Sequence, residues 1–474
     1  AGPNRECECF EWVHARHTKG NRGNVKTTHR NLWITPATNA KLSTAGTIAP
    51  VEAVIIGAGV NGLTAAARLA KAGWRVDVFE RADRVGGAAR TDVIDGRLID
   101  RGAACHPFGA ASPAFAQLGL DVEWLRAPIE MAHPLDDGAA FLHRSLAQTA
   151  AELGPDARAW RGIHAPVVDH IDAHLANALA PPNRWPAHPL RLAQFGARGA
   201  WPAAAVPLRT ERARALFAGS AAHAILPPTR AGTAAFGVLF GALGMTRGWP
   251  VAKGGSEVVA RGLAELVEKH GGRIHCNRDV PHNAPKRRRG PGVHKVDFLL
   301  NEPVPWRDPR VGQAATVHLG GTLREIDHAE RAIRRGRLPE RPFVMAAQQF
   351  VADPQRGLSL WTYAHVPAGY RERYPGEVRE LITRQVERFA PGFRDVVERV
   401  VEASPADLER WDPCLVGGDI ANGAHPLIRL PHRLGAGEYL ASSAAAPGAG
   451  VHGMPGWWAA EAALRDFDPG ALSG

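Results

Sequence analysis

Three glycines and one acid near residue 60 have the types and spacing of a dinucleotide site. Gly57, Gly59 and Gly62 form a G-x-G-x-x-G turn, and Glu80 follows 23 residues after the first glycine. Such glycines permit a tight turn, a close approach of the backbone to a pyrophosphate, and close packing of the next helix. An acid at that distance can accept hydrogen bonds from an adenosine ribose. The four residues therefore predict a site for an adenine dinucleotide.

The surrounding sequence contains the elements that must position these residues. Residues 54–56 are an apolar run typical of a buried parallel strand, and an alanine- and leucine-rich helix is expected from there to Gly73. A second strand is expected at residues 75–79. Strand, turn, helix, strand and acid thus follow the order of a Rossmann unit. An ordinary strand–helix–strand unit with a glycine-rich turn would not need the terminal acid.

A second glycine pair, Gly86 and Gly87, follows Arg84 closely. This run resembles the R-x-G-G motif of FAD proteins of the amine oxidase and phytoene desaturase superfamily. Glycines there would let the chain pass close to the flavin side of the cofactor, and Arg84 could reach a phosphate or ribose. Nicotinamide dehydrogenases have no general need for the segment, so it favours FAD over NAD. A surface turn with a solvated arginine is the alternative.

Length and apolar content fit a two-domain globular protein. The chain has 474 residues, enough to bury a large core. Its longest apolar stretch, residues 234–245, is shorter than the about 20 residues that span a bilayer. It indicates a buried helix or one wall of a pocket for an apolar ligand. No apolar signal-peptide core is present, so a cytoplasmic location is expected, with peripheral membrane contact left open.

Charge and cysteine content argue against other classes of protein. The formal net charge is +10, and the basic run 286–289 reads as a solvated loop; without a recognised nucleic-acid-binding module, no nucleic-acid partner is expected. Five cysteines, odd in number and mostly far apart, favour a reducing compartment. Cys7 and Cys9 with His14 and His17 could bind a metal. The segment around them shows no packing pattern, so no metal is expected.

The remaining segments read as an extension, a helical region and a sheet. Residues 1–50 lack periodicity and are expected to be a disordered basic extension, whereas residues 115–247 read as helices broken by proline-rich connections. An amphipathic helix from about Ser256 to Gly271 is followed by an expected strand at residues 273–280.

The pattern changes to sheet after residue 292. Strands at residues 316–319, 343–349 and 358–366 are expected to join one over residues 293–300 in an antiparallel sheet that floors a pocket. The first of these strands carries an alternating face: His294, Val296, Phe298 and Leu300. We expect this face, through Phe298, to line the pocket together with residues 234–245. A further amphipathic helix is expected at residues 378–389.

The end of the chain repeats the pattern of strand, glycines and helix. A short strand is expected at residues 439–441, and the glycine-rich run 446–456 leads into a final alanine-rich helix. Glycines directly before a helix present backbone amides to an anion or to the edge of a flavin ring. If the cofactor-binding domain is built from separate parts of the sequence, the C-terminal segment must return to it in this way.

Residues 52–467 together resemble the phytoene desaturase-like FAD oxidoreductases, a group that includes carotenoid desaturases and isomerases and pyridine nucleotide-disulfide oxidoreductase domain-containing protein 2. The motifs that carry the resemblance are GAGVNGLTAAARLAKAG, ERADRVGGAART, DRGAACHPFGAASPAF, GWPVAKGGSEVVARGL, VGGDIANGAH and PGAGVHGMPG.

The resemblance implies an α/β fold with a discontinuous, Rossmann-type FAD-binding domain of the glutathione reductase and amine oxidase kind. That domain would comprise residues 51–114, 248–290 and 405–474. A second, α+β substrate domain would comprise residues 115–247 and 291–404. Members of the group usually carry a longer segment before the strand near Val293, which completes the cofactor sheet, whereas this chain has only residues 281–292 there.

The resemblance also implies the residues that bind FAD. Val280 would meet the adenine through its backbone, and Gly450, Val451 and His452 would lie beside the flavin ring. The other expected FAD contacts are Gly57, Gly59, Gly62, Glu80, Arg84, Gly86 and Gly87.

The implied reaction is hydride transfer between the flavin and a C–H or C=C bond of an apolar, isoprenoid or lipid-like substrate. His106, His425 and His452 are candidate catalytic residues because they lie in glycine-rich motifs and histidine titrates in the useful range. The electron acceptor (oxygen, quinone or nicotinamide) and the oligomeric state stay open. One alternative is a flavin amine oxidase-like enzyme, which would need an aromatic cage for the amine; with only four tyrosines in the chain, this is less expected. The other alternative is a catalytically impaired FAD-fold protein with a binding or regulatory role.

Overall fold

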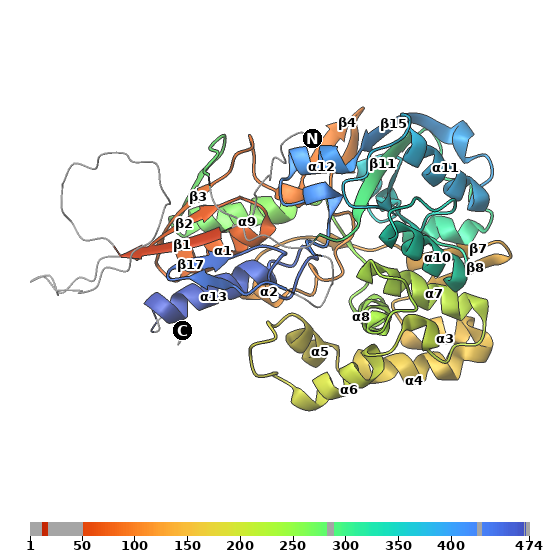
Figure 1. Cartoon of the computed structure of the whole chain (residues 1–474), viewed down its shortest axis with the longest axis horizontal. Coiled ribbons are helices and arrows are strands. Elements are labelled where there is room, and N and C mark those ends of the chain that lie inside the picture. The colour runs from red at the N-terminus through yellow and green to blue at the C-terminus, as the bar shows by residue number, and fades with distance from the viewer. Residues whose placement is uncertain (1–11, 18–50, 282–288, 424–428, 469, 471–474) are drawn as a thin grey trace, which may run out of the picture.

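The computed structural model describes residues 12–17, 51–281, 289–423, 429–468 and 470. Two sheets organise these residues, and Figure 1 shows one sheet in the left-hand part of the molecule and the other toward the right, with helices packed around both. Residues 286–288 of the basic run 286–289 lie outside the described residues, as do the cysteines Cys7 and Cys9. No helix of the described chain combines the length and apolarity needed to cross a bilayer.

The left-hand sheet is the predicted Rossmann-type sheet. Its strand order is β10 (Arg273–His275), β3 (Arg75–Phe79), β2 (Val51–Ile56), β1 (Trp12–His17), β17 (Glu438–Leu440) and β16 (Arg433–Gly435). Strands β10, β3 and β2 are parallel, whereas β1 is antiparallel to both β2 and β17. Strand β17 therefore runs in the same direction as β2. The predicted strands at 75–79 and near 439–441 are confirmed.

Three helices cover this sheet, and all three were expected. Helix α1 (Val60–Lys71) buries a nearly continuous run of small residues, so that α13 (Met454–Phe467) and α9 (Glu257–Lys269) can pack closely against it. The first and last helices of the described chain are thus neighbours, as Figure 1 shows.

Two expectations about this sheet are wrong. Residues 12–17 of the expected disordered extension form strand β1, which pairs with β2 on one edge and β17 on the other. The strand is ordered by this pairing, and the sequence of the segment itself does not indicate a strand. The strand expected at 273–280 ends at His275. Beyond it Asn277 adopts a positive φ of 57°, and its amide donates to the carbonyl of Ala82, which turns the chain over the loop after β3.

The second sheet has seven strands among the described residues. Their order is β15 (Val397–Ala403), β11 (Gly292–Leu300), β14 (Ser359–Val366), β13 (Val344–Ala347), β12 (Ala314–Leu319), β7 (Ile129–Leu135) and β8 (Gly138–Leu142). All neighbours are antiparallel except β12 and β7, which are parallel, so the expected antiparallel sheet is confirmed only in part.

Strands β7 and β8 lie in a region that was expected to be helical, and that expectation is wrong for residues 124–142. Every residue of β7 is buried, so the strand shows no alternation of polar and apolar residues. Helices do follow, as expected: α3 (Leu146–Glu152), α4 (Ala157–Val168), α5 (Ile171–Ala178), α6 (Pro189–Gly199), α7 (Glu211–Ala221) and α8 (Thr233–Thr246).

The two faces of the seven-stranded sheet have different cover. Helix α11 (Glu377–Phe389) packs on one face, where the ring of Phe298 lies 5.0 Å from that of Phe393. Helices α7 and α8 pack on the other face, which we call the inner face. Phe298 therefore does not line a pocket with residues 234–245, because the alternation of β11 turns its side chain to the face opposite α8.

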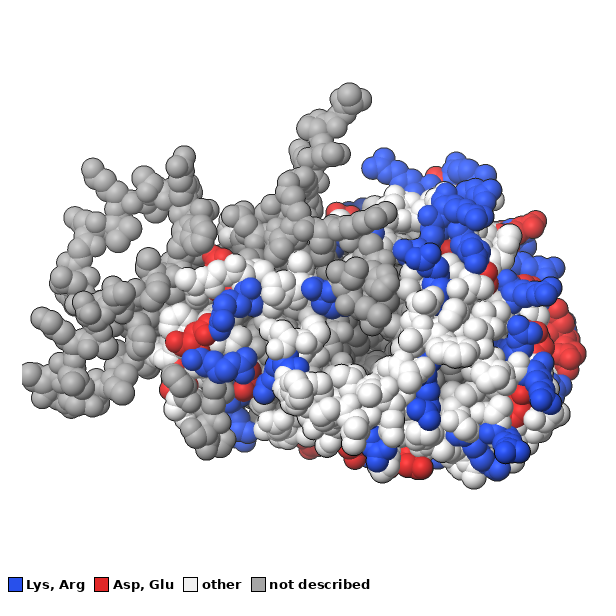
Figure 2. All heavy atoms as spheres, turned by 60° about the horizontal axis from the view of Figure 1, so that its bottom comes forward, with Lys and Arg blue, Asp and Glu red and all other residues white. Residues whose placement is uncertain are grey.

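The remaining strands and α-helices of the described residues lie outside the two large sheets. They are the hairpin β4 (Thr91–Ile94) and β5 (Arg97–Asp100), the paired strands β6 (Trp124–Leu125) and β9 (Val251–Ala252), and the helices α2 (Pro113–Leu118), α10 (Leu323–Arg334) and α12 (Pro405–Trp411). On the face shown in Figure 2, basic side chains lie close together at the upper right and elsewhere alternate with acidic ones, and uncharged side chains make up much of the middle.

Candidate functional site

The strand ends of the six-stranded sheet bring distant segments to one edge. The ladders pair Ile56 with Phe79 and Phe79 with His275, and both Ile56 and Leu440 pair with Trp12. The carboxyl ends of β2, β3, β10 and β17 therefore lie at the same edge, which is where open α/β sheets bind their ligands. The loops that leave this edge carry most of the predicted cofactor residues.

The first glycine loop leaves β2 at this edge. Gly57 has a positive φ of 97°, and its amide donates to the carbonyl of Phe79 at 2.8 Å. A Cβ on Gly62 would lie 2.1 Å from the carbonyl oxygen of Gly57, so only glycine lets α1 begin this close to the strand. The amino end of α1, with its partial positive charge, thus lies at the sheet edge.

Glu80 follows β3 and closes the same loop. Its Oε2 accepts a hydrogen bond from the amide of Ala58 at 2.8 Å, and its Oε1 accepts one from the amide of Ala82 at 2.9 Å. These contacts hold the carboxylate beside the glycine loop. Since each carboxylate oxygen can accept more than one hydrogen bond, the group can still accept from a ribose hydroxyl.

The second glycine pair lies against the first loop. The amide of Gly86 donates to the carbonyl of Ala58 at 2.9 Å, and a Cβ on Gly87 would lie 3.0 Å from the Cα of Gly59. Arg84 has acidic partners: it donates to Asp92 Oδ1 at 2.7 Å and lies 3.3 Å from Glu257 Oε2. The hydrogen bond to Asp92 raises the pKa of Arg84, so the guanidinium stays charged but is engaged by carboxylates.

Val280 lies in the segment that follows β10, and this segment contacts Glu80. The amide of Arg278 donates to the carbonyl of Glu80 at 2.8 Å, and Val280 follows two residues later in a half-buried position. The segment after β10 therefore crosses the loop after β3 at the carboxyl edge.

The C-terminal glycine segment meets the first turn of α1. A Cβ on Gly456 would lie 1.8 Å from the carbonyl oxygen of Asn61, and one on Gly453 would lie 2.3 Å from Thr64 Oγ1. Just before it, Gly450 and Val451 lie against the loop that follows β5: the carbonyl oxygen of Val451 is 3.0 Å from the position of a Cβ on Gly109. The two glycine-rich segments, near the start and the end of the described chain, are thus side by side.

The predicted catalytic histidines hold loops in place. Ser256 Oγ donates to the carbonyl of Ala103 at 2.6 Å and lies 2.8 Å from His106 Nε2, so His106 donates there. His452 Nδ1 accepts from the amide of Met454 at 3.2 Å, and its carbonyl accepts from Ser112 Oγ at 2.6 Å. Burial lowers the pKa of each ring to about 4, so both are neutral near neutral pH. His425 lies outside the described residues.

A buried ion pair that the sequence did not indicate links the end of β5 to the turn that precedes β14 of the seven-stranded sheet. Asp100, at the end of β5, accepts from Thr91 Oγ1 at 2.6 Å, from the amide of Ser256 at 2.8 Å and from Arg356 at 2.9 Å. Burial alone would raise the pKa of Asp100, but Arg356 and the hydrogen bonds outweigh it and lower the pKa. Asp100 begins the DRGAACHPFGAASPAF motif, which was the available signal, whereas its partner Arg356 was too distant in sequence to identify.

Histidines on the inner face of the seven-stranded sheet were also missed. His133, His318 and His365 come from β7, β12 and β14, and His318 Nε2 lies 3.1 Å from His223 Nε2. Burial lowers the pKa of His133 to about 4 and that of His223 to about 3. Burial also lowers the pKa of His318, so His133, His223 and His318 are neutral near neutral pH. Each of these residues looks ordinary within its own strand, so the sequence carried no signal that would group them.

A row of half-buried rings connects α8 to the C-terminal glycine segment. Phe240 of α8 stacks on His223 with ring centres 4.6 Å apart and meets Phe108 edge-on at 5.2 Å. Phe108 in turn meets His452 edge-on at 5.8 Å, and Phe236 stacks beside Phe240 at 6.4 Å. We call Phe236, Phe240 and Phe108 the aromatic row. It offers an apolar surface beside the expected position of the flavin.

A comparison with known protein families also identifies a dinucleotide-binding unit in the part of the chain that forms this edge of the six-stranded sheet. Residues 55–118 match the family described as NAD(P)-binding Rossmann-like domain. The chain is 31% identical over 94 residues to 1-hydroxycarotenoid 3,4-desaturase of Flavobacterium sp. (strain P99-3), covering 19% of each chain. It is 32% identical over 135 residues to one polypeptide of the limonene dehydrogenase of Castellaniella defragrans, covering 27% of this chain and 25% of the relative.

These matches span about a fifth to a quarter of the relatives' lengths. Among solved structures, cyclohexylamine oxidase from Brevibacterium oxydans IH-35A superposes with a TM-score of 0.47 at 14% identity, covering 88% of this chain and 98% of that one. The matched family and the strand order together show that the chain carries a Rossmann-type dinucleotide-binding unit.

Proposed function

We propose that the protein is an FAD-dependent oxidoreductase that transfers a hydride between the flavin and a C–H or C=C bond of an apolar, isoprenoid-like substrate. The observation that carries this proposal is the meeting of two glycine-lined segments, after β2 and before α13, at the sheet edge that also holds Glu80. A relative named 1-hydroxycarotenoid 3,4-desaturase and one named limonene dehydrogenase support both the reaction and the isoprenoid substrate class.

The residues at the edge fit FAD. Gly59 and Gly87 approach so closely that a Cβ on Gly87 would lie 3.0 Å from the Cα of Gly59, which leaves backbone rather than side chains facing the cofactor. Glu80 is fixed where it can accept from the adenosine ribose, and Val280 lies in the segment expected at the adenine. The segment Gly450–His452 directly precedes α13, whose first residues pack on the first turn of α1, so the segment can flank the flavin ring.

The bound flavin would supply the redox chemistry by accepting or donating a hydride. The protein would bind and orient the cofactor and the substrate. The amino end of α1 attracts the pyrophosphate, and the Glu80 carboxylate holds the ribose. The aromatic row presents apolar surface, and each methylene buried against it stabilises the complex by about 0.8 kcal/mol. Neutral His106 and His452 keep their loops in position without placing a charge beside the substrate.

The reaction is tested by anaerobic reduction of the FAD-loaded protein. We expect acyclic or cyclic terpenes and polyenes to bleach the flavin absorbance, and Phe240→Ala to slow this bleaching by removing substrate contact. Phe298→Leu, on the face covered by α11, is the matched control and should leave the rate unchanged. Bleaching by primary or secondary amines but not by any terpene would favour the amine oxidase-like alternative. Reoxidation by oxygen, a quinone or an oxidised nicotinamide then identifies the acceptor.

We also propose that the protein binds a membrane surface, from which it would collect a lipophilic substrate. Trp185, Leu190 and Trp201, on or beside α6, have exposed fractions of 87%, 80% and 56%. Helix α6 lies at the outer edge of the molecule in Figure 1 and carries Arg191 and Arg198. Exposed tryptophans beside a helix that carries basic residues are typical of interfacial binding.

Cosedimentation with anionic phospholipid vesicles tests this second proposal. The double variant Trp185→Ser, Trp201→Ser should lose most of the vesicle binding of the wild type, whereas Val93→Ser, at another exposed apolar residue, should keep it. Equal binding by all three proteins would exclude α6 as the contact.

A further inference from the structure

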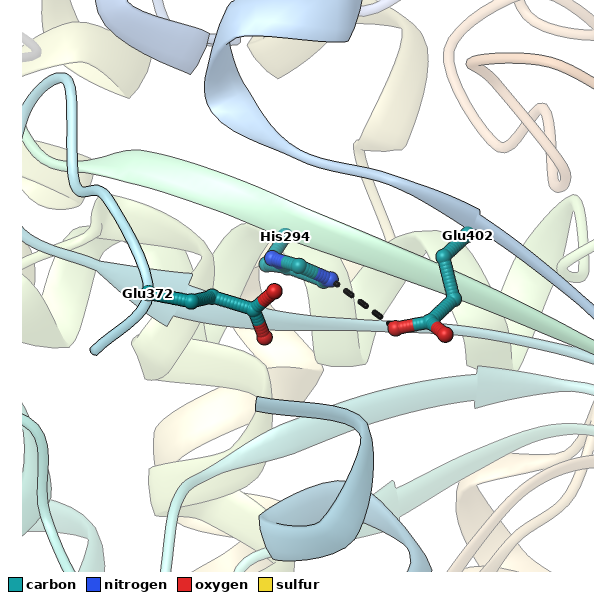
Figure 3. A group of neighbouring side chains, drawn as sticks. All are labelled: His294, Glu372 and Glu402. Atoms are coloured by element: carbon teal, nitrogen blue, oxygen red, sulfur yellow. Dashed lines mark ion pairs between the residues drawn. The ribbon is translucent and has the colours of Figure 1, made fainter. Parts of the chain in front are cut away.

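We propose that His294, Glu372 and Glu402 bind a zinc ion on the face of the seven-stranded sheet covered by α11. One potential ligand atom from each residue lies within 4.8 Å of the other two. Figure 3 shows the imidazole between the two carboxylates, with Glu372 and Glu402 approaching from opposite sides. The site lies on the face opposite the inner histidines and is independent of the proposed flavin site.

Three separate segments bring these residues together. His294 lies near the start of β11, and Glu402 lies near the end of the neighbouring β15, where it pairs with Val296 of β11. Glu372 comes from the chain between β14 and α11. The antiparallel ladder fixes the spacing of the first two ligands, and the connection to α11 places the third above the same strand.

The imidazole of His294 is buried without a hydrogen-bond partner among the described residues for either ring nitrogen. The residue is 1% exposed. Its Nε2 lies 3.6 Å from Glu402 Oε2, which is an ion-pair distance longer than a hydrogen bond. A buried, unsatisfied imidazole is unfavourable unless a ligand completes it.

Both carboxylates also accept hydrogen bonds from neighbouring groups. Glu372 Oε1 accepts from the amide of Val378 at 2.8 Å, and Glu402 Oε1 accepts from Arg379 at 2.5 Å. Metal-binding carboxylates in proteins usually have such outer partners, which fix the ligand and tune its charge. Two carboxylates and one guanidinium leave a net negative charge around the imidazole, which suits a divalent cation.

The ligand types select the metal. One imidazole nitrogen and two carboxylate oxygens form a mixed set that suits zinc, whereas magnesium prefers oxygen ligands alone. Zinc lies about 2.0–2.2 Å from such atoms, so binding must draw the ligands closer than their present separation. The Glu402 side chain is 26% exposed and Glu372 is half-buried, so both can rotate inward. Bound zinc would tie β11 and β15 to the chain entering α11.

Zinc binding to the full-length protein tests the proposal. We would measure zinc affinity by competition with a chromophoric chelator for the wild type, Glu372→Gln and Glu402→Gln. Each variant removes one ligand charge while keeping the side-chain size. Glu398→Gln is the matched control, because Glu398 is also on β15 and also forms an ion pair with an arginine, Arg97. Thermal unfolding with zinc or with magnesium reports the choice of metal.

We expect Glu372→Gln and Glu402→Gln each to weaken one zinc site by about tenfold or more and Glu398→Gln to leave it unchanged. Zinc, but not magnesium, should raise the unfolding temperature of the wild type. Substituted cobalt should show no thiolate charge-transfer band, which separates this site from one built on Cys7 and Cys9. Equal zinc affinity in the wild type and both ligand variants, equal weakening by Glu398→Gln, or equal stabilisation by magnesium would each overturn the proposal.

Discussion

Glu80 shows how one side chain both shapes the site and takes part in it. Its carboxylate ties the loop after β2 to the loop after β3 through the amides of Ala58 and Ala82. The same group is expected to accept hydrogen bonds from the ribose. The negative charge therefore strengthens both sets of contacts, since hydrogen bonds to an ionised acceptor are stronger than neutral ones.

Replacing the charge at this position should weaken FAD binding. Glu80→Gln keeps the size of the side chain and one acceptor oxygen, and we expect a loss of about 1–3 kcal/mol in the free energy of FAD binding. Titration of the apoprotein with FAD measures it. Glu265→Gln, at an exposed position of α9, is the control. If Glu80→Gln bound FAD as tightly as the wild type, the role assigned to Glu80 would be wrong.

Spacing along the sequence was enough to predict residues that act locally, but not residues whose partners are distant. The glycines of the first loop and Glu80 were recognisable because strand, turn and helix fix their geometry within one unit. Asp100 and Arg356 were not, since they lie 256 positions apart in the sequence and meet only in the folded protein. His133 and His318 were missed for the same reason: each looks ordinary within its own strand.

At the scale of elements, the packing of α13 on α1 unites the two ends of the site. The approach is so close at Gly456 that its position allows no side chain. The strands and helices around this contact were predictable from periodicity. Strand β1 was not, because its order comes from pairing with β2 and β17, and neither was β7, because burial on both faces removes the alternating pattern.

A methyl group at this contact should separate the two helices. Gly456→Ala would place Cβ 1.8 Å from the carbonyl oxygen of Asn61. We expect it to lower the free energy of unfolding by about 1–3 kcal/mol, measured by urea denaturation, and to weaken FAD binding as well.

Gly162→Ala in α4 is the control for this substitution. No atom lies within 4 Å of its Cβ position, and alanine favours the helix, so stability should rise by about 0.5–1 kcal/mol. A Gly456→Ala protein as stable as the wild type would show that α13 and α1 are less closely packed than described.

For the molecule as a whole, buried neutral histidines set the response to acid. Burial holds the pKa of His106, His133 and His452 at about 4, compared with about 6.5 in an unfolded chain. Between these values the unfolded chain binds more protons than the folded one. The free energy of unfolding therefore falls as the pH is lowered from about 6.5 toward 4.

Acid should thus destabilise the protein over a defined range. We expect urea denaturation to give a lower free energy of unfolding at about pH 5 than at about pH 7. His133→Gln should reduce this difference, and His328→Gln, at an exposed position of α10, should not. The same stability at both pH values would contradict the neutral, buried state assigned to these rings.

The central claim is that two glycine-lined segments far apart in sequence grip a single FAD. Titration of the apoprotein with FAD, followed by flavin fluorescence and visible absorbance, tests it most directly. The geometry predicts saturable uptake of one FAD per chain, with affinity lost in Gly456→Ala and retained in Gly162→Ala. A protein that stays colourless in the presence of excess FAD would contradict the claim.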